Sequence, residues 1–243
     1  FGTGSQVNTG TPYYASGSPS IDQLSFVPRG RSNGTVTIGY TATNTTGQSV
    51  SGQLVFNISN SGNSKYFNDL IYCTWAAPSV DYLYENRVTK GVTATSYAPN
   101  QQIQRGDFVL MLVRALSLTG SGGYSFPDVA TTEYFASAVA IAKQRGVVNG
   151  DNGYFKPYSP VTRQDAMVII KNALAASGRN LGSGSTSILN TFSDGSTVSS
   201  YARDAVSTLV QLGAVTGDNG RLLPHNPITR AEAAVILHFV MTM

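Results

Sequence analysis

Ile228-Thr229-Arg230-Ala231-Glu232 lies near the end of the chain and closes the last of three copies of one pattern. Each copy has a Phe-x-Asp start, an aromatic residue that opens a helix-like stretch, and a closing segment with an arginine at its centre. The starts are Phe67-Asn68-Asp69, Phe126-Pro127-Asp128 and Phe192-Ser193-Asp194. The two earlier closing segments are Ile103-Gln104-Arg105-Gly106-Asp107 and Val161-Thr162-Arg163-Gln164-Asp165. A unit of this size cannot bury its apolar face alone, so the repeat predicts an array whose units pack on one another.

From Phe67 onward the apolar residues follow the helical period. One face of the second copy is apolar from Ala138 to Ala142 and ends at Gly146, which predicts a helix with a glycine stop. The third copy ends in the same way at Gly213. We predict a helical domain over residues 67–243, with a Gly/Ser-rich linker at 177–187. The predicted repeats are 67–125, 126–191 and 192–243.

Residues 1–66 follow the alternation of β-strands instead. Strand-like stretches cover 21–26, 35–40 and 50–56, and Gly, Asn and Ser residues separate them. We predict a small β-rich module over 21–66, comparable to part of a sandwich, because a complete sandwich has about seven strands. The Gly/Ser/Thr-rich segment 1–20 is predicted to be a flexible arm or a docking strand. The predicted fold class is therefore α+β, a small β-module followed by an all-α array.

Composition narrows the classes of function. Apolar residues make up 41% of the 243 residues, enough for a core, and charged residues only 12%, against about 25% in ordinary domains. The net charge of +3 is spread thinly, which argues against nucleic-acid binding because that needs clustered Lys and Arg. No run approaches the ~18 apolar residues of a membrane helix. The single Cys73 excludes an internal disulfide framework, and the start at Phe1 without a leader pattern predicts a processed form.

The closing segments have the pattern of helix N-termini. Thr162 with Asp165, and Thr229 with Glu232, have the spacing of a capping box, and Glu232 fits it best. Capping does not explain the arginine between them, since a cation in the first helical turn opposes the helix dipole. One interpretation is an anion site in which the arginine acts beside free backbone amides. The other is an ion pair with the aspartate of a Phe-x-Asp start (Asp69, Asp128 or Asp194), and both interpretations stay open at this stage.

Together these residues resemble the S-layer homology (SLH) motif, with its Phe-x-Asp start, aromatic-Ala helix, glycine turn and Ile-Thr-Arg-Ala-Glu closing helix. The resemblance covers Phe67–Met243, and the third closing segment matches the family's string letter for letter. It implies a three-pronged pseudo-trimer of helical hairpins formed within one chain. It also implies non-covalent anchoring to a secondary cell-wall polysaccharide of bacteria, often one with an anionic pyruvylated sugar. The implied location is extracellular, in the cell wall or S-layer.

The resemblance also nominates glycan-binding residues. In the family the closing arginine contacts the acidic sugar in grooves between neighbouring repeats, which points to Arg105, Arg163 and Arg230. The aromatic openers are candidates to stack on sugar faces, with at least part of each ring expected in the helical core: Trp75, Tyr134 and Tyr201. Glycine amides and the capping threonines complete the candidate set: Gly146, Gly213, Thr162 and Thr229.

Repeat one departs from the pattern. Gln104 stands in place of the capping threonine, Gly106 weakens the helix start, and Arg87 stands where the other repeats have Gly146 and Gly213. Its loop before the closing segment is also one residue longer. Repeats two and three are therefore expected to carry most of the binding.

Two other classes of function compete with anchoring. An enzyme is disfavoured because His225 and His238, the two histidines, have no Cys or Ser in a triad pattern, and no paired glycosidase carboxylates occur. We predict no catalysis, no cofactor and no metal. A self-assembling surface protein, in a lattice or a filament, is the sharper alternative, because the arm at 1–20 could pair with the open β-edge of a neighbouring subunit.

Overall fold

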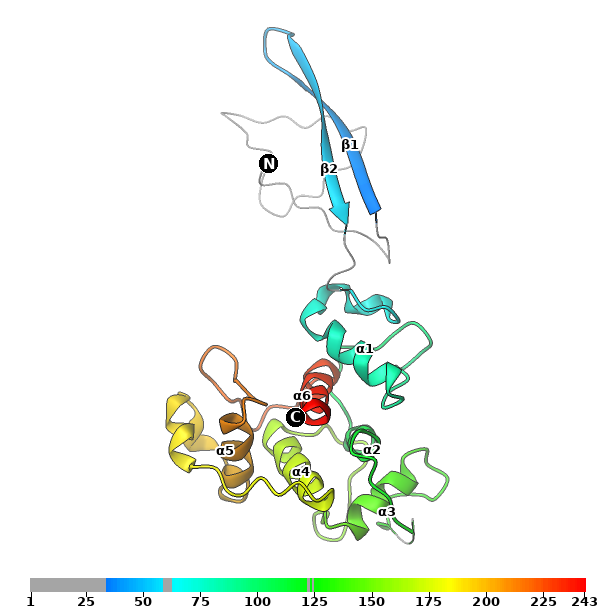
Figure 1. The fold of residues 1–243 in the computed structure, drawn as a ribbon, viewed down its shortest axis with the longest axis vertical. Helices are drawn as coiled ribbons and strands as arrows, with labels where there is room; N and C mark the ends of the chain where they lie inside the picture. The colour runs from blue at the N-terminus through cyan, green and yellow to red at the C-terminus, as the bar shows by residue number, and fades with distance from the viewer. Residues whose placement is uncertain (1–33, 59–62, 122, 124) are drawn as a thin grey trace. The chain divides into compact units, whose positions relative to one another are not determined.

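The computed structural model describes residues 34–58, 63–121, 123 and 125–243. The chain divides into two compact units, residues 1–59 and 60–243. The described part of the first unit is a β-hairpin, and the second unit holds the helices (Figure 1). The predicted arm at 1–20 and the predicted strand at 21–26 lie outside the described residues. At this level the α+β fold class is confirmed.

The hairpin consists of β1 (Gly34–Thr43) and β2 (Ser49–Ile58), which pair antiparallel and confirm two of the three predicted strands. Its register gives the two faces different chemistry. One face aligns Ile38 with Leu54, Tyr40 with Gly52, and Ala42 with Val50. The other face carries the exposed Val55 but is otherwise mainly polar, with side-chain hydrogen bonds of 3.0 Å between Thr41 and Ser51 and 2.8 Å between Thr43 and Ser49. The hairpin is therefore amphipathic along its length.

The helical unit contains six α-helices and five short 3₁₀ segments among the described residues. The α-helices are α1 (Ala77–Glu85), α2 (Arg105–Ala115), α3 (Ala136–Gln144), α4 (Arg163–Ala176), α5 (Arg203–Gln211) and α6 (Arg230–Thr242). The 3₁₀ segments are η2 (Asn68–Tyr72), η3 (Thr74–Ala76), η4 (Thr186–Thr191), η5 (Gly195–Thr197) and η6 (Ser200–Ala202). Each repeat thus supplies one helix after its aromatic opener and one after its closing segment, as the periodicity predicted.

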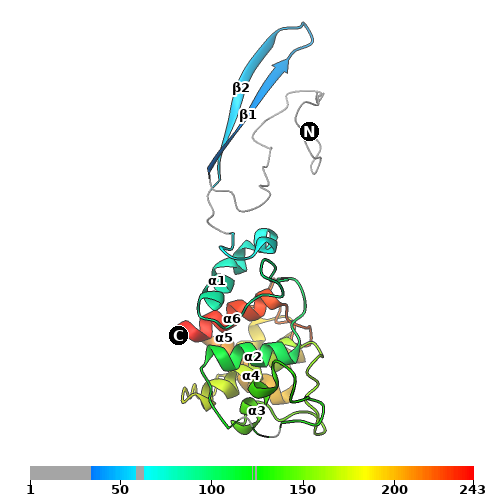
Figure 2. The same cartoon turned by 90° about the vertical axis from the view of Figure 1, so that its right-hand side faces the viewer.

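The closely packed helix pairs join different repeats. Helix α2 packs on α3, α4 on α5, and α6 on α1 (Figure 2). The last of these pairs brings the C-terminal helix onto the first one. Each closing helix is therefore covered by the opening helix of the next repeat, and the third repeat is covered by the first.

A ring of backbone hydrogen bonds joins the three closing segments. The amide of Ile103 donates to the carbonyl of Ile228 at 3.0 Å, Ile228 donates to Val161 at 3.0 Å, and Val161 donates to Ile103 at 3.1 Å. All three side chains are fully buried. Each residue directly precedes a helix-capping position, so the ring fixes where α2, α4 and α6 begin relative to one another.

The aspartate of each Phe-x-Asp start clamps the loop that precedes a closing segment. Asp128 accepts hydrogen bonds from the amides of Phe155 and Lys156, at 3.0 and 2.7 Å. Lys156 has a positive φ of 59°, an unfavourable conformation for a residue with a side chain, and the clamp holds it there. The equivalent aspartates bind the amides of Tyr97 and Ala98 (Asp69) and of Leu222 and Leu223 (Asp194).

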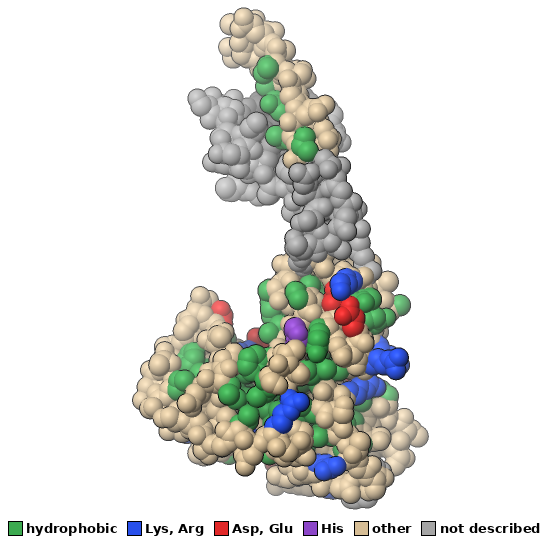
Figure 3. Space-filling model, viewed as in Figure 1, with side chains coloured by type: hydrophobic (Ala, Val, Ile, Leu, Met, Phe, Trp, Pro, Cys, Tyr) green, Lys and Arg blue, Asp and Glu red, His purple; other side chains and the backbone are tan. Residues whose placement is uncertain are grey.

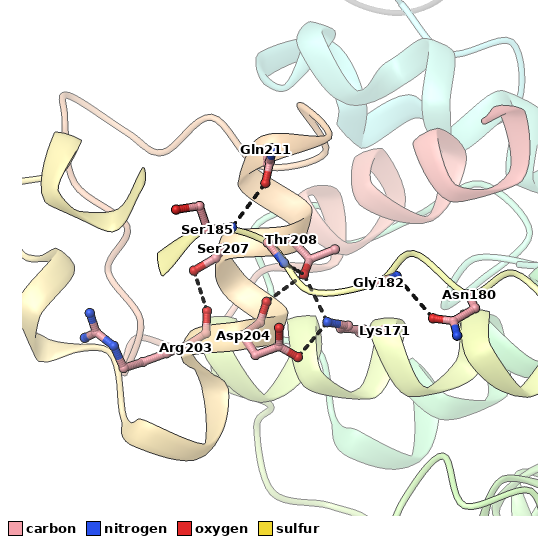
Figure 4. A network of polar contacts seen from close by, with 10 residues as sticks. Lys171, Asn180, Gly182, Ser185, Arg203, Asp204, Ser207, Thr208 and Gln211 are labelled. Carbon is pink, nitrogen blue, oxygen red and sulfur yellow. Dashed lines mark hydrogen bonds and ion pairs between the residues drawn. The ribbon is translucent and has the colours of Figure 1, made fainter. Parts of the chain in front are cut away.

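The Gly/Ser-rich linker before repeat three is bound along helix α5. Figure 4 shows Lys171 of α4 donating to Asp204 and Thr208 of α5, at 2.6 and 3.0 Å. The amide of Gly184 donates to the Thr208 hydroxyl at 3.0 Å. A Cβ at position 184 would lie 2.6 Å from the Thr208 backbone nitrogen, so glycine is what allows this close approach.

Candidate functional site

The closing helices begin with their backbone amides already used. In α2 the Arg105 amide donates to the carbonyl of Ser159 at 3.0 Å, and the Gly106 amide donates to Pro157 at 2.8 Å. Both carbonyls belong to the loop of the next repeat. The matching bonds are Arg163 to Asn226 and Gln164 to Pro224 in α4, and Arg230 to Gln101 and Ala231 to Pro99 in α6. The prediction that the backbone amides at these helix starts are free is therefore wrong, because carbonyl groups of the neighbouring repeat accept their hydrogen bonds.

Each closing arginine also reaches into the next repeat. The Nε atoms of Arg105, Arg163 and Arg230 donate to the carbonyls of Phe155, Leu222 and Tyr97, at 3.0, 2.9 and 2.9 Å. These carbonyls occupy equivalent positions, just before the residue with positive φ. The arginine therefore helps to hold repeats together, which accounts for a cation at a helix start that the dipole alone disfavours.

Two of the three arginines are also ion-paired, but not with the predicted partners. Arg163 contacts Glu232 at 2.5 Å and Arg230 contacts Asp107 at 3.4 Å. Both guanidinium side chains are largely buried, with 12% and 6% of their surface exposed. The predicted pairing with Asp69, Asp128 or Asp194 is wrong, because those carboxylates clamp loop amides instead.

Arg105 is different. Among the described residues no carboxylate lies within ion-pair distance of it, and its terminal amino groups have no hydrogen-bond partner. Its guanidinium lies 5.2 Å from the centre of the Phe155 ring. Burial lowers the pKa of Arg105, while the charge of Asp165 and the nearby Tyr201 oppose that shift. Sequence reasoning had favoured repeats two and three, yet the open guanidinium belongs to repeat one.

The aromatic openers lie mostly on the surface. Trp75, Tyr134 and Tyr201 are 58%, 64% and 60% exposed, so most of each side chain faces solvent, and the expected core contact is limited to the covered part of each ring. The next residue is fully buried in each case: Ala76, Phe135 and Ala202. The position after the opener therefore faces the core, and the opener faces solvent.

Acidic residues of the closing segments link these aromatics to the arginines. The Tyr134 hydroxyl donates to Asp107, which also pairs with Arg230. The Tyr201 hydroxyl donates to Asp165 at 2.7 Å. Partial burial and this hydrogen bond raise the pKa of Tyr201 to about 12, so both hydroxyls stay protonated donors at neutral pH.

We name three joints by these residues. The first joint contains Asp107, Tyr134 and Arg230, and the second contains Asp165, Tyr201 and Arg105. The third contains Glu232 and Arg163, and η3, which carries Trp75, packs against α6 there. Each joint thus combines residues from all three repeats.

The remaining candidates have structural contacts. Thr162 accepts a hydrogen bond from the Asp165 amide, and Thr229 with Glu232 forms a complete capping box, as predicted. Gly146 and Gly213 have φ of 70° and 77°, and their amides donate to the ends of their own helices. Arg87, the substitute in repeat one, adopts the same positive φ, 62°.

Sequence reasoning missed the acids as partners between repeats, and it missed Gln164. This buried glutamine donates to the Tyr201 hydroxyl at 2.9 Å and to Ser199 at 3.1 Å, and lies 3.3 Å from His225 Nδ1. The Asp, Asp and Glu at equal distance from the three arginines were visible as a repeated feature. The residue after the arginine varies between Gly, Gln and Ala, so the repeat gave no signal for Gln164.

The structure brings Ser79 of α1 to His238 of α6, with 2.9 Å between Oγ and Nδ1. No pattern in the sequence indicated this contact. Tyr82 stacks on the histidine ring, with 4.3 Å between centres, and no carboxylate binds the ring in the described part of the chain. We interpret this pair as packing between α1 and α6.

The described residues do not favour a metal site, a membrane span or a nucleic-acid surface. They contain no group of three His, Cys, Asp or Glu that could hold a metal ion, and none of their helices is long and apolar enough to cross a membrane. Figure 3 shows Lys and Arg side chains scattered over this face of the helical unit, without one basic patch.

Comparison with known families matches the three repeats. The model of the S-layer homology domain matches residues 66–109, 125–167 and 191–234, together more than half of the chain. Each match begins one residue before a predicted repeat.

Curated relatives divide into enzymes and surface-layer proteins. An amylopullulanase of Thermoanaerobacterium thermosulfurigenes is 32% identical over 182 residues, which cover 72% of this chain and 9% of the relative. The surface-layer 125 kDa protein of Lysinibacillus sphaericus is 28% identical over 167 residues, 67% of this chain and 14% of the relative. The S-layer protein sap of Bacillus anthracis is 24% identical over 172 residues, which cover 70% of this chain and 20% of the relative. The chain thus spans a fifth or less of these relatives, and the enzyme is matched over only a small part of its length.

Proposed function

The chain belongs to the S-layer homology domain family, and from this premise we propose that it anchors a larger surface protein by binding an anionic secondary cell-wall polysaccharide. The family and the S-layer relatives make it a surface-anchoring module outside the bacterial cell. The anchoring itself needs no catalysis, and the pyruvylated sugar is the ligand that we propose.

We further propose that the helical unit is the three-pronged pseudo-trimer of this family. Two observations support it: the closed ring of hydrogen bonds through Ile103, Val161 and Ile228, and the packing of α6 on α1. In this arrangement the prongs are the three helix pairs, and each joint is the place where a prong meets the next closing segment.

The open guanidinium of Arg105 carries the proposal for the ligand. Two neighbouring N–H groups of an arginine bind a carboxylate in a fork, which suits an acidic sugar. Arg105 offers such groups without breaking a protein contact, whereas Arg163 and Arg230 would first have to leave Glu232 and Asp107. Removing one partner from a buried ion pair is costly, so the second joint is the principal anion site in this proposal.

The other candidates have graded roles. We propose that Tyr201 and, in the other joints, Tyr134 and Trp75 offer ring faces to the sugars. Arg163 and Arg230 contribute where a ligand displaces their carboxylates. We assign Gly146, Gly213, Thr162 and Thr229 to holding the joints in shape, since their polar groups are engaged within the chain.

Sedimentation with purified Gram-positive-type cell walls tests this function. The unsubstituted chain is expected to bind intact walls and to lose binding when the secondary polymer is chemically removed. Arg105→Ala is expected to weaken binding about ten- to a hundredfold, because it removes charge-assisted hydrogen bonds worth about 1.5–3 kcal/mol. Arg145→Ala is the matched control, since Arg145 is exposed at the end of α3 and its side chain donates to the Thr119 carbonyl.

Equal binding to intact and stripped walls would contradict the proposed ligand. Binding by Arg105→Ala that equals that of Arg145→Ala, with both variants folded, would remove Arg105 from the site. Thermal melting monitored by circular dichroism verifies the fold of each variant.

Self-assembly through the β-region is the second candidate function. The hairpin presents Ile38, Tyr40 and Leu54 on one face, and these side chains are only half-buried. A two-stranded hairpin is marginally stable alone, so we propose that the arm at residues 1–20 of a second subunit docks on this module. Deleting residues 1–20 is expected to abolish multimers in light scattering if the arm docks between chains, and unchanged multimers would refute that docking.

A further inference from the structure

Two exposed tyrosines stand on either side of one buried phenylalanine at the first joint. Tyr134 and Tyr158 are 64% and 55% exposed, whereas Phe135 is fully buried. The Phe135 ring centre lies 4.9 Å from that of Tyr134 and 5.8 Å from that of Tyr158, and both contacts are edge-to-face, with interplanar angles of 73°. The two exposed rings are therefore oriented by a shared support.

Carboxylates fix the far ends of the same rings. The Tyr134 hydroxyl donates to Asp107, and the Tyr158 hydroxyl donates to Glu133 at 2.6 Å. An exposed tyrosine normally turns freely about two bonds. Here each ring is held at its edge by Phe135 and at its hydroxyl by an acid, so little rotational entropy remains to be lost on binding.

The glycine in the closing segment makes room for this arrangement. A Cβ at Gly106 would lie 2.9 Å from the Phe135 ring. The other joints differ at the positions that match Gly106, Phe135 and Tyr158: the second has Gln164, Ala202 and His225, and the third has Ala231, Ala76 and Asn100. The paired aromatic platform of Tyr134, Phe135 and Tyr158 is thus particular to the first joint.

The first joint does not offer its arginine to a ligand. Its arginine, Arg230, is only 5% exposed. The guanidinium forms an ion pair with Asp107, donates to the Tyr97 carbonyl and lies over the Tyr97 ring. Asp107 and Glu133 add negative charge beside the rings. An acidic sugar is therefore disfavoured at this place, whereas the apolar C–H face of an uncharged sugar suits an aromatic ring.

We propose that the Tyr134–Phe135–Tyr158 platform is a subsite for a neutral sugar residue of the polysaccharide, separate from the anion site at Arg105. The inference rests on the proposed function, because it assumes that the chain binds a wall glycan. The two joints then bind different parts of one polymer. A neutral sugar lies on the aromatic rings of the first joint, and an acidic substituent binds Arg105 at the second. A polymer that occupies both gains affinity through the linkage of two weak sites.

Binding of two forms of the wall polysaccharide separates the two sites. The purified polymer is used intact and after acid removal of its acidic substituents, and affinity is measured by isothermal titration. Tyr158→Ala is expected to weaken binding of both forms by the same factor, about three- to tenfold, because an aromatic contact is lost in each case. Arg105→Ala is expected to weaken binding of the intact polymer only. Tyr158→Phe keeps the ring but loses the hydroxyl contact with Glu133, so it is expected to weaken binding of both forms less than Tyr158→Ala does.

Tyr154→Ala is the matched control, since Tyr154 is also exposed in the same repeat, at 52%, and is not part of the platform. A Tyr158→Ala affinity equal to that of Tyr154→Ala on both polymers would overturn the inference alone. A loss by Tyr158→Ala on the intact polymer only would also overturn it. Absence of binding by the unsubstituted chain to either form would overturn the proposed function and this inference with it.

Discussion

The second and third joints have the same plan but differ in how the acid meets the arginine. In the third joint Glu232 divides its two oxygens, with Oε2 capping Thr229 at 2.7 Å and Oε1 contacting Arg163 at 2.5 Å. In the second joint the shorter Asp165 binds Tyr201 and does not reach Arg105. Asp107 in the first joint lies between these extremes, at 3.4 Å from Arg230. Asp107 and Asp165 have equal length, yet only Asp107 pairs with its arginine, so the placement of the carboxylate, and not its length alone, separates a paired arginine from an open guanidinium.

Removing the acid of the locked joint is expected to have the largest effect on stability. Glu232→Ala removes a capping box and leaves Arg163 largely buried without its partner, so we expect a loss of about 2–4 kcal/mol in the free energy of unfolding. Asp165→Ala in the open joint removes an exposed tyrosine contact and an acidic charge in the first helical turn, while Thr162 still caps the amide of residue 165. We expect a loss of about 0.5–1 kcal/mol. Urea denaturation of both variants measures the difference, and equal losses would contradict the distinction between the joints.

Filling the space beneath Phe135 tests whether the first joint depends on its glycine. Gly106→Ala gains helix propensity of at most about 1 kcal/mol but overpacks the core at a cost of about 1–3 kcal/mol. We expect a net loss of about 1 kcal/mol in the free energy of unfolding. Ala231→Gly in the third joint is the comparison, because Ala76 replaces the phenylalanine there. A more stable Gly106→Ala variant would show that Phe135 moves aside freely.

Exchanging the two acids converts one kind of joint into the other. Asp165→Glu brings a longer carboxylate toward Arg105 and completes the capping box, so we expect about 0.5–1 kcal/mol of added stability. The same change is expected to weaken wall binding several-fold, because the guanidinium gains a competitor. Glu232→Asp is the reciprocal variant and is expected to lose stability without losing wall binding. Unchanged wall binding by Asp165→Glu, together with the stability gain, would exclude Arg105 as the anion contact.

The smallest expected effects are two pH dependences, of which the first arises at the contact of α6 with α1. Burial lowers the pKa of His238, so the unfolded chain binds a proton that the folded chain resists. Stability therefore falls as the pH drops below about 6.5, the ordinary histidine value. Stability curves of His238→Gln against pH are expected to be flat between pH 5 and 7, where the unsubstituted chain declines. A decline of equal size in both proteins would assign it to another group.

A second, steeper loss is expected in acid. Burial raises the pKa of Asp69, Asp128 and Asp194. The hydrogen bonds that these carboxylates accept from loop amides lower it by more, so each pKa lies below its ordinary value. Folding therefore favours the charged form, and this stabilisation is lost as the pH falls below about 4. Asp128→Asn is expected to reduce the steepness of that loss.

Local signals in the sequence sufficed for the elements of the fold. The helical period and the glycine stops predicted α3 and α5, the capping box at Thr229 predicted the start of α6, and strand alternation predicted β1 and β2. These features depend on residues a few positions apart, so their physics is contained in short segments. The pairing of α6 with α1 was not predictable in this way, because it joins opposite ends of the repeat array.

The candidate site was predictable in its residue types and not in its contacts. The repeated arginine stood out, yet its partners were misjudged as Asp69, Asp128 and Asp194. Those aspartates satisfy loop amides that no local pattern reveals, and the actual partners lie one repeat further on. Repeat one was expected to be the weaker site because its residues match the motif less well. The motif describes how the helices start, and it does not show which guanidinium remains unpaired.

The sequence alone determined that three units exist, where their helices start and stop, and which family they resemble, because caps, glycines and apolar periodicity act over one or two helical turns. The tertiary structure decided which residues of one repeat contact those of the next. Closing the ring at Ile103, Val161 and Ile228 brings side chains of all three repeats to each joint. Only there do distances of a few ångströms decide that Arg163 and Arg230 are held by carboxylates while the guanidinium of Arg105 stays open.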